Sequence, residues 1–245
     1  MFFKKKKIKL ECYTPYGYVA NHFPLQLAKK DTPEAFDAMP AYIKAPANYT
    51  ACPYTKLINT RKLHTIKHCD GILGLWEKSY ILYAPFDIAI NIKNNKVEYT
   101  SADTNLFKVA EHPTAQFDGM FPNYVNIKMV IPWKFIANKS LNCMFSPAFY
   151  HLDENIRENV YFPQAIVDYK YVHSTNILFF VKKQVEQKVI HIKAGTPLIY
   201  ITPLTDEPIE LVTKVVDKQY WEGLENQNIG FKSIYKALKR KDKNK

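Results

Sequence analysis

The sequence predicts a mostly β protein with an irregular N-terminal region and a C-terminal helix. Three observations support this fold class. Runs dense in β-branched and aromatic residues follow one another from residue 80 to residue 216, and turn-forming dipeptides separate them. Prolines and aromatic residues without clear periodicity fill residues 2–54. Helical spacing of apolar residues returns only near the C-terminal end.

Two short helices are expected before the strands. The Thr32–Pro33 pair is typical of a helix start, with threonine as the N-cap and proline at the first helical position. Asp70 is expected to cap a helix over residues 71–78, which would turn Leu73 and Trp76 toward the core. Both helices precede the β-rich part of the chain.

Six apolar runs are predicted to form the β structure. They cover residues 81–92, 124–136, 176–181, 188–192, 197–204 and 209–216. A helical segment follows, because apolar residues there recur at helical spacing. Those residues are Tyr220, Trp221 and Leu224, and then Phe231, Ile234, Tyr235 and Leu238.

The formal net charge of +11 over 245 residues is concentrated at the two ends. Residues 1–11 contain five lysines against Glu11, and residues 236–245 contain six basic residues against Asp242. The rest of the chain keeps a net charge of only +2. This distribution argues against a domain that reads nucleic acid. The ends predict either a weak contact with nucleic acid or an anionic surface, or simply solvated tails.

The chain therefore divides into three parts: a basic N-terminal tail at 1–11, a single β-rich domain at 12–216, and a C-terminal helical segment with a basic tail at 217–245. A hydrophobic content of 47% excludes global disorder. No run reaches the ~18–20 apolar residues of a membrane span. Four cysteines without a CxxC pair indicate free thiols of a cytosolic protein, and residues 1–11 do not resemble a secretory signal.

Two groups of residues could hold a metal. His64 and His68 lie four residues apart beside Cys69, but no second cysteine accompanies Cys52, so a basic surface turn is the favoured alternative. In the second group, His151, Asp153 and the distal His191 match the ligand types of the facial triad in non-haem iron oxygenases. Its alternative is that the first two are polar loop residues. No arginine follows within a strand's length of His191 to hold a 2-oxoacid, and Lys193 is the only residue that could replace it. P-loop, Rossmann and hydrolase-elbow motifs do not occur in the sequence.

The order of features over residues 162–204 carries a resemblance. The turn Ala165-Ile166-Val167-Asp168-Tyr169-Lys170-Tyr171 is followed by the predicted strands 177–181 and 189–192 and by the segment 194–200. This order resembles the distal half of dUTPases and dCTP deaminases, the β-clip superfamily. The resemblance implies a dUTPase-like β-clip barrel or sandwich with its core at about 120–205, and a homotrimer with shared sites.

The resemblance also implies roles for two side chains. Asp168 would activate a water molecule, and Tyr171 would stack on a pyrimidine; Mg²⁺ would be a cofactor only if this chemistry operates. The alternative is an aspartate that closes a turn and a half-buried tyrosine. The family's phosphate-binding loop would fall at 146–149, which lacks its arginine. Its upstream signature has a faint equivalent at 101–106, and its glycine-rich lid would fall at 229–233, which holds one glycine. A degenerate catalytic site is therefore expected.

A wider pattern resembles a protein family found mainly in tailed phages and in some bacteria. Its features are matched, in order, by residues 65–71, 131–133, 145–147, 165–168 and 194–197. We therefore expect a viral, phage-type protein of the host cytoplasm, either free or with the virion. The expected function is a non-enzymatic or catalytically degenerate binding or accessory module. The alternatives are a dUTP- or dCTP-type hydrolase with Asp168 as base, a non-haem iron oxygenase, and a basic-tailed nucleic-acid-binding protein.

Overall fold

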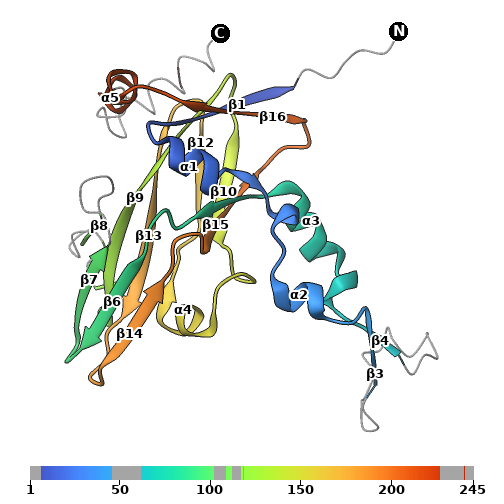
Figure 1. Cartoon of the computed structure of the whole chain (residues 1–245), viewed down its shortest axis with the longest axis vertical. Helices are drawn as coiled ribbons and strands as arrows, with labels where there is room; N and C mark the ends of the chain where they lie inside the picture. Colours follow the sequence, from blue (N-terminus) through green and yellow to red (C-terminus); the bar gives the residue numbers. More distant parts are fainter. Residues whose placement is uncertain are drawn as a thin grey trace.

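Strands dominate the structure, a computed structural model that describes residues 7–45, 62–101, 109–111, 117, 119–226 and 240. Strands make up 46% and helices 22% of it, which confirms the predicted mostly β class (Figure 1). The strands form mixed and antiparallel sheets, and a short helix follows the last strand. No helix in this part of the chain combines the length and apolar character that crossing a bilayer requires.

The largest sheet, here called the β9 sheet, is organised around one long strand. Its strand order is β11-β13-β9-β1-β16, and β8 also pairs with β9. The strands are β1 (Ile8–Thr14), β8 (Val109–Glu111), β9 (Tyr124–Ala137), β11 (Val160–Tyr161), β13 (Ser174–Lys182) and β16 (Ile209–Val215). Strands β1 and β16 pair in parallel and the other pairs are antiparallel. Alternate residues of β9, such as Ile127, Met129 and Phe135, face the core and are buried.

A second sheet, the β15 sheet, has the order β12-β10-β15-β5-β2. Its strands are β2 (Gln26–Leu27), β5 (Tyr80–Tyr83), β10 (Asn142–Pro147), β12 (Ala165–Asp168) and β15 (Pro197–Pro203). A third sheet, the β6 sheet, has the order β14-β6-β7 and forms the flank at the lower left of Figure 1. Its strands are β6 (Ile88–Lys93), β7 (Lys96–Ser101) and β14 (Lys188–Ile192).

One hydrophobic core joins these three sheets. Leu10 of the β9 sheet, Ile201 of the β15 sheet and Ile90 of the β6 sheet belong to the same buried cluster, and none of the three has exposed surface. A smaller cluster around Trp76 and Tyr200 lies beside it. Because the three sheets share this core, they cannot separate without exposing it.

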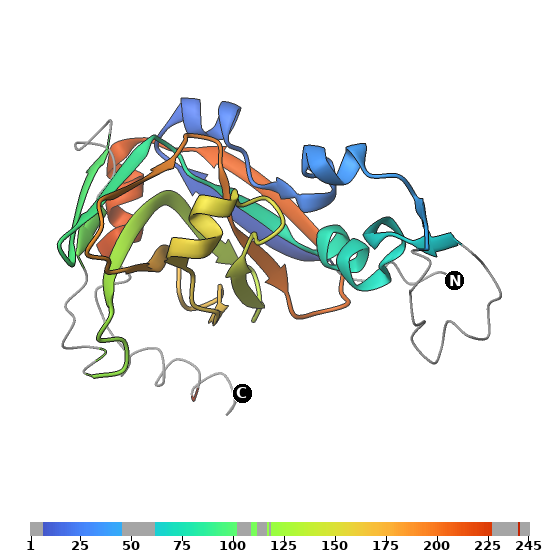
Figure 2. The ribbon, with the colours of Figure 1, turned by 90° about the horizontal axis from the view of Figure 1, so that it is seen from below.

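Short helices are interspersed among the strands along the chain, and one follows the last strand. They are α1 (Gly17–His22), η1 (Ala28–Lys30), α2 (Glu34–Ala38), η3 (Ile66–His68), α3 (Asp70–Lys78), α4 (Glu154–Asn159) and α5 (Lys218–Asn226). Helices α2 and α3 lie beside the small hairpin of β3 (Tyr42–Lys44) and β4 (Lys62–His64), which projects away from the sheets in both views (Figures 1 and 2).

The caps of α2 and α3 differ from the sequence prediction. Pro33 is the N-cap of α2, and the Thr32 hydroxyl donates instead to the Asp37 carboxylate at 2.8 Å. Helix α3 takes in Asp70 as its first residue, so Cys69 occupies the cap position. Trp76 points into the core as predicted, and Ile72 is more deeply buried than the expected Leu73.

Two predicted boundaries also differ from the structure. Residues 8–11, assigned to the basic tail by their charge, form the first half of β1, a strand paired on both sides. The apolar run 81–92 is divided between β5 and β6, which belong to different sheets. The helical pattern at 231–238 and the remaining tail residues, apart from Lys7 and Arg240, lie outside the described residues.

Candidate functional site

Asp168, the proposed base, is the last residue of β12 and is 1% exposed. Its Oδ2 accepts a hydrogen bond from the Ser140 hydroxyl at 2.6 Å. Its Oδ1 accepts from the backbone N–H groups of Leu141 at 3.0 Å and Lys170 at 3.1 Å. Both carboxylate oxygens are therefore engaged inside the protein, in the arrangement of an aspartate that closes a turn.

Tyr171, the proposed stacking residue, lies in the turn after Asp168 and is half-buried. Its N–H donates to the Asp168 carbonyl at 3.1 Å, and the Lys170 ammonium lies 5.2 Å from its ring centroid. Tyr169 is the deeper of the two tyrosines: it has no exposed surface and its ring lies 4.9 Å from that of Phe135. The turn thus inserts Tyr169 into the core and leaves Tyr171 at its edge.

The segments expected to bind phosphate are either part of a sheet and its turn or outside the described residues. Ser146 and Pro147 belong to β10 and pair with Tyr200 and Ile199 of β15, and Ala148 is fully buried. Apart from Ser101, the end of β7, the upstream signature at 101–106 lies outside the described residues, as does the whole lid segment at 229–233. The first half of the expected phosphate loop is therefore sheet backbone, and Phe149 lies in the turn that follows β10.

His151 takes part in a buried polar network. Its Nδ1 lies 2.7 Å from the Tyr200 hydroxyl, and its Nε2 contacts the carbonyl oxygen of Asp31. Because a carbonyl oxygen only accepts, Nε2 carries the proton and Nδ1 accepts from Tyr200. The same hydroxyl accepts from the Trp76 indole N–H at 2.9 Å. Burial lowers the pKa of His151 below its ordinary 6.5, so the imidazole is held neutral.

The network continues through the side chain of Asp31. Its Oδ2 accepts from the Tyr83 hydroxyl at 2.7 Å, and Tyr83 accepts from Gln26 at 2.8 Å. Burial raises the pKa values of Tyr83 and Tyr200 above their ordinary 10, so both phenols keep their protons. These residues join β2, β5, β15 and α3, which indicates a structural task.

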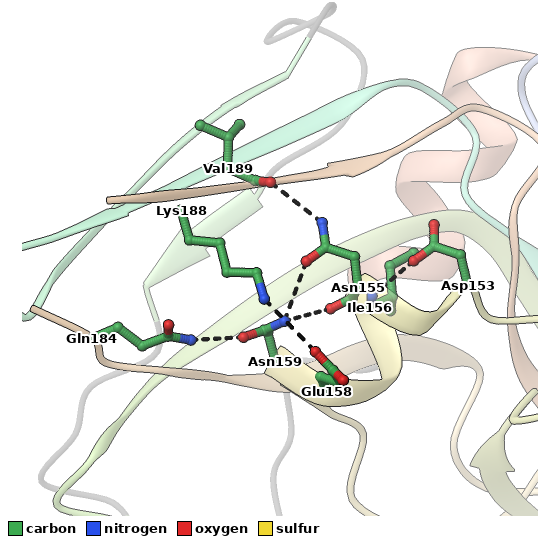
Figure 3. A network of polar contacts seen from close by, with 8 residues as sticks. All are labelled: Asp153, Asn155, Ile156, Glu158, Asn159, Gln184, Lys188 and Val189. Atoms are coloured by element: carbon green, nitrogen blue, oxygen red, sulfur yellow. Dashed lines mark hydrogen bonds and ion pairs between the residues drawn. The ribbon is translucent and has the colours of Figure 1, made fainter. Parts of the chain in front are cut away.

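Asp153 caps α4, whose Ile156 N–H donates to its Oδ1 at 2.8 Å. Figure 3 shows that helix tied to its neighbours through Asn159. The Asn159 amide donates to the Asn155 carbonyl at 2.7 Å and its Oδ1 accepts from Gln184 at 2.6 Å. Asn155 in turn donates to the Val189 carbonyl at 3.3 Å. The polar residues of this loop thus anchor a helix.

His191 lies on β14, paired with Ala89 of β6, and is exposed. The structure does not bring it together with His151 and Asp153. Among the described residues, no group of three or more histidine, cysteine, aspartate or glutamate side chains is placed to share one metal ion.

The other histidine pair is in ring contact, with His64 on β4 of the projecting hairpin and His68 at the end of η3. The rings of His64 and His68 lie 4.7 Å apart, and Tyr42 lies 4.8 Å and 5.0 Å from them. Cys69 is exposed nearby, and Cys52 lies outside the described residues.

Of the other cysteines, Cys12 and Cys143 are buried free thiols. Burial, with a smaller effect of the Asp168 carboxylate, raises the pKa of Cys143 to about 12. Burial likewise raises the pKa of Cys12. Neither thiol is therefore activated as a nucleophile at neutral pH.

A feature that the sequence interpretation missed is a hollowed outer face on the β6 sheet. One cleft of about 370 Å³ is lined by Asp87, Ile88, Ala89, Thr100, His191, Ile192 and Lys193. A second of about 210 Å³ is lined by Asn91, Lys93, Asn94, Lys96 and Glu98. The alternation of apolar and other residues along 88–93 could have placed Asn91 on this face. The pairing that brings Thr100 and His191 beside Ala89 joins separate strands, so no local pattern predicts it.

Comparison with known proteins adds no relative. No protein-family model matches the chain, and the search of curated proteins finds no sequence similar enough to indicate a shared family.

Proposed function

We propose that this chain is a non-enzymatic or catalytically degenerate binding module built on a β-clip-type domain. The observation that carries this proposal is the state of Asp168. At 1% exposure, with both carboxylate oxygens accepting hydrogen bonds from Ser140, Leu141 and Lys170, it has no free oxygen directed at a water molecule. A general base must reach the proton that it removes.

The surroundings of Asp168 support the same proposal. A triphosphate needs several charge-assisted donors, and the segment expected to supply them is engaged in the β15 sheet through Ser146 and Pro147. The order of motifs shared with the phage-type family supports an accessory role in a viral programme, in the host cytoplasm or with the virion. A homotrimer remains part of this proposal.

The test is turnover of dUTP and dCTP by the full chain with Mg²⁺, measured as released pyrophosphate, phosphate and ammonia. We expect no turnover. Asp168→Asn is expected to lower the melting temperature, because an amide nitrogen cannot accept the hydrogen bonds that the carboxylate accepts. Asp153→Asn is the matched control, since asparagine caps a helix about as well as aspartate.

Two results would contradict the proposal. One is Mg²⁺-dependent turnover that Asp168→Asn abolishes while the fold is retained. The other is turnover that survives in Asp168→Asn, since it would place an active site elsewhere on the chain.

A further inference from the structure

The outer face of the β6 sheet is polar, and the pairing of its strands aligns its side chains. Ile88, Ile90 and Ile92 of β6 are buried in the core. The intervening residues, Ala89 and Asn91, therefore face outward. Across the sheet, Thr100 and His191 flank Ala89, and Glu98 and Val189 flank Asn91. Alanine is the smallest member of its row, and the larger cleft opens over it.

The two clefts lie along the same strand. The first surrounds Ala89 and the second begins at Asn91 and extends to Lys93. At about 3.3 Å per residue, Ala89 and Lys93 lie roughly 13 Å apart. A ligand that contacts the nearer ends of both clefts, at Ala89 and Asn91, must span roughly 7 Å, which is more than a single ion does.

The polar side chains of this face have almost no partners within the protein. In the described part of the chain no hydrogen bond or ion pair engages the side chains of Thr100, His191 or Glu98. The same holds for Lys93, Lys96 and Lys193. By contrast, Glu11 on the β9 sheet forms ion pairs with Lys9 and Lys214, and the polar residues around α4 form the network of Figure 3.

Asn91 is the most informative of these residues. Its Oδ1 has no hydrogen-bond partner and is shielded from solvent. An amide oxygen left in this state costs free energy that a donor would recover. Asn91 lines the second cleft, so a rotation of its side chain would bring Oδ1 to a hydroxyl or N–H group of a ligand there.

We propose that this face binds a small hydroxyl-bearing anion of the class of sugar acids and sugar phosphates. The three lysines supply cations for a phosphate or carboxylate, and Asn91 Oδ1 and Glu98 accept from hydroxyl groups. No phenylalanine, tyrosine or tryptophan lines either cleft, so a stacked nucleobase is not favoured. The inference rests on the proposed binding role and gives it a ligand class.

The experiment is NMR titration of the ¹⁵N-labelled full chain with glucose 6-phosphate and with glucuronate. We expect shifts confined to β6, β7, β14 and the Asn91 side-chain amide. Glucose lacks the anionic group and inorganic phosphate lacks the sugar hydroxyl groups. Each should therefore bind at least about tenfold more weakly. Lys193→Ala and Thr100→Val should each weaken binding severalfold, whereas Lys30→Ala, an exposed lysine outside this face, should not.

Several outcomes would overturn the inference: no shift at about 10 mM of either anion, shifts spread over lysines elsewhere, or equal binding of inorganic phosphate. Both test substitutions are at exposed positions, and their melting temperatures verify that the fold is kept. Failure here is distinguishable from failure of the proposed function. The latter appears as turnover of dUTP or dCTP, which the titration with sugar anions does not measure.

Discussion

At the residue scale, the informative groups are buried polar side chains that satisfy one another. Trp76, His151 and Tyr200 come from distant parts of the chain and share one hydroxyl, and Asp168 closes its own turn. Each arrangement uses residue types that also occur in catalytic sites. Geometry separates the two uses, because every hydrogen-bonding atom that these side chains direct inward already has a partner.

The neutral state of His151 makes stability depend on pH. Its folded pKa is lowered, so the unfolded chain takes up the proton first, near pH 6.5. The contribution is therefore complete above pH 6.5 and is lost as the pH falls from 6.5 toward the folded pKa. Burial also lowers the pKa of His173, which acts in the same direction.

Urea unfolding between about pH 8 and about pH 5 measures this effect. We expect the free energy of unfolding to fall below pH 6.5 by up to about 1.4 kcal/mol per pH unit for each histidine. His151→Gln should reduce the slope of the free energy of unfolding against pH. The part of the slope that comes from His173 should remain. An unchanged slope in that variant would show that His151 is protonated as easily in the folded state as in the unfolded one.

At the element scale, α5 is positioned by a buried lysine. Lys134 of β9 is 2% exposed; its ammonium donates to the Trp221 carbonyl at 3.0 Å and lies 4.0 Å from the Trp221 ring centroid. The ring of Tyr220 lies 5.5 Å from that of Tyr13 on β1. The helix thus covers the outer face of the β9 sheet where β1 and β9 pair.

Trp221→Ala is expected to release α5 while leaving the sheets folded. The change removes the ring above a desolvated ammonium, a contact worth about 2 kcal/mol in buried settings. Hydrogen exchange of the amides of residues 218–226 should become faster, while exchange in β9 should stay slow. Trp221→Phe keeps an aromatic face and should show a smaller change. Equal protection of α5 in wild type and Trp221→Ala would contradict this role.

At the scale of the whole molecule, part of the charge that makes up the net +11 belongs to the folded domain and not to a tail. Strand β1 lies between β9 and β16 and pairs with both. Its Ile8 and Leu10 are buried, although Lys7, Lys9 and Glu11 alternate with them. A proposed electrostatic contact with nucleic acid must therefore be tested without removing this strand.

Two truncations test the boundary. A chain that starts at residue 7 loses three lysines, Lys4 to Lys6, and should keep its melting temperature. A chain that starts at residue 12 loses the buried Ile8 and Leu10 and half of β1, so it should fail to give a cooperative thermal transition by circular dichroism. A cooperative transition in the shorter chain would show that the core does not depend on the first half of β1.

Local patterns predicted the strands best where one face is buried and the segment is regular. The run 188–192 corresponds to β14, and 209–216 to β16 within one residue. The charge pattern assigns the first half of β1 to the tail, because Lys9 and Glu11 separate the apolar residues Ile8, Leu10 and Cys12. The run 81–92 was not divided, since the break at 84–87 depends on backbone contacts of Ala84 with Gly195 and Thr196.

The sequence by itself determined the mostly β class, the turn at Asp168 and the uneven distribution of charge. The tertiary structure decided which residues meet: His151 with Tyr200, Asp168 with Ser140, and Thr100 with His191 across Ala89. The physical reason is the distance along the chain over which each kind of interaction acts. Periodicity and turn chemistry act over a few residues and are present in any local stretch. Strand pairing and the burial of polar groups join segments far apart in the chain, and only the folded core selects among the possible pairings.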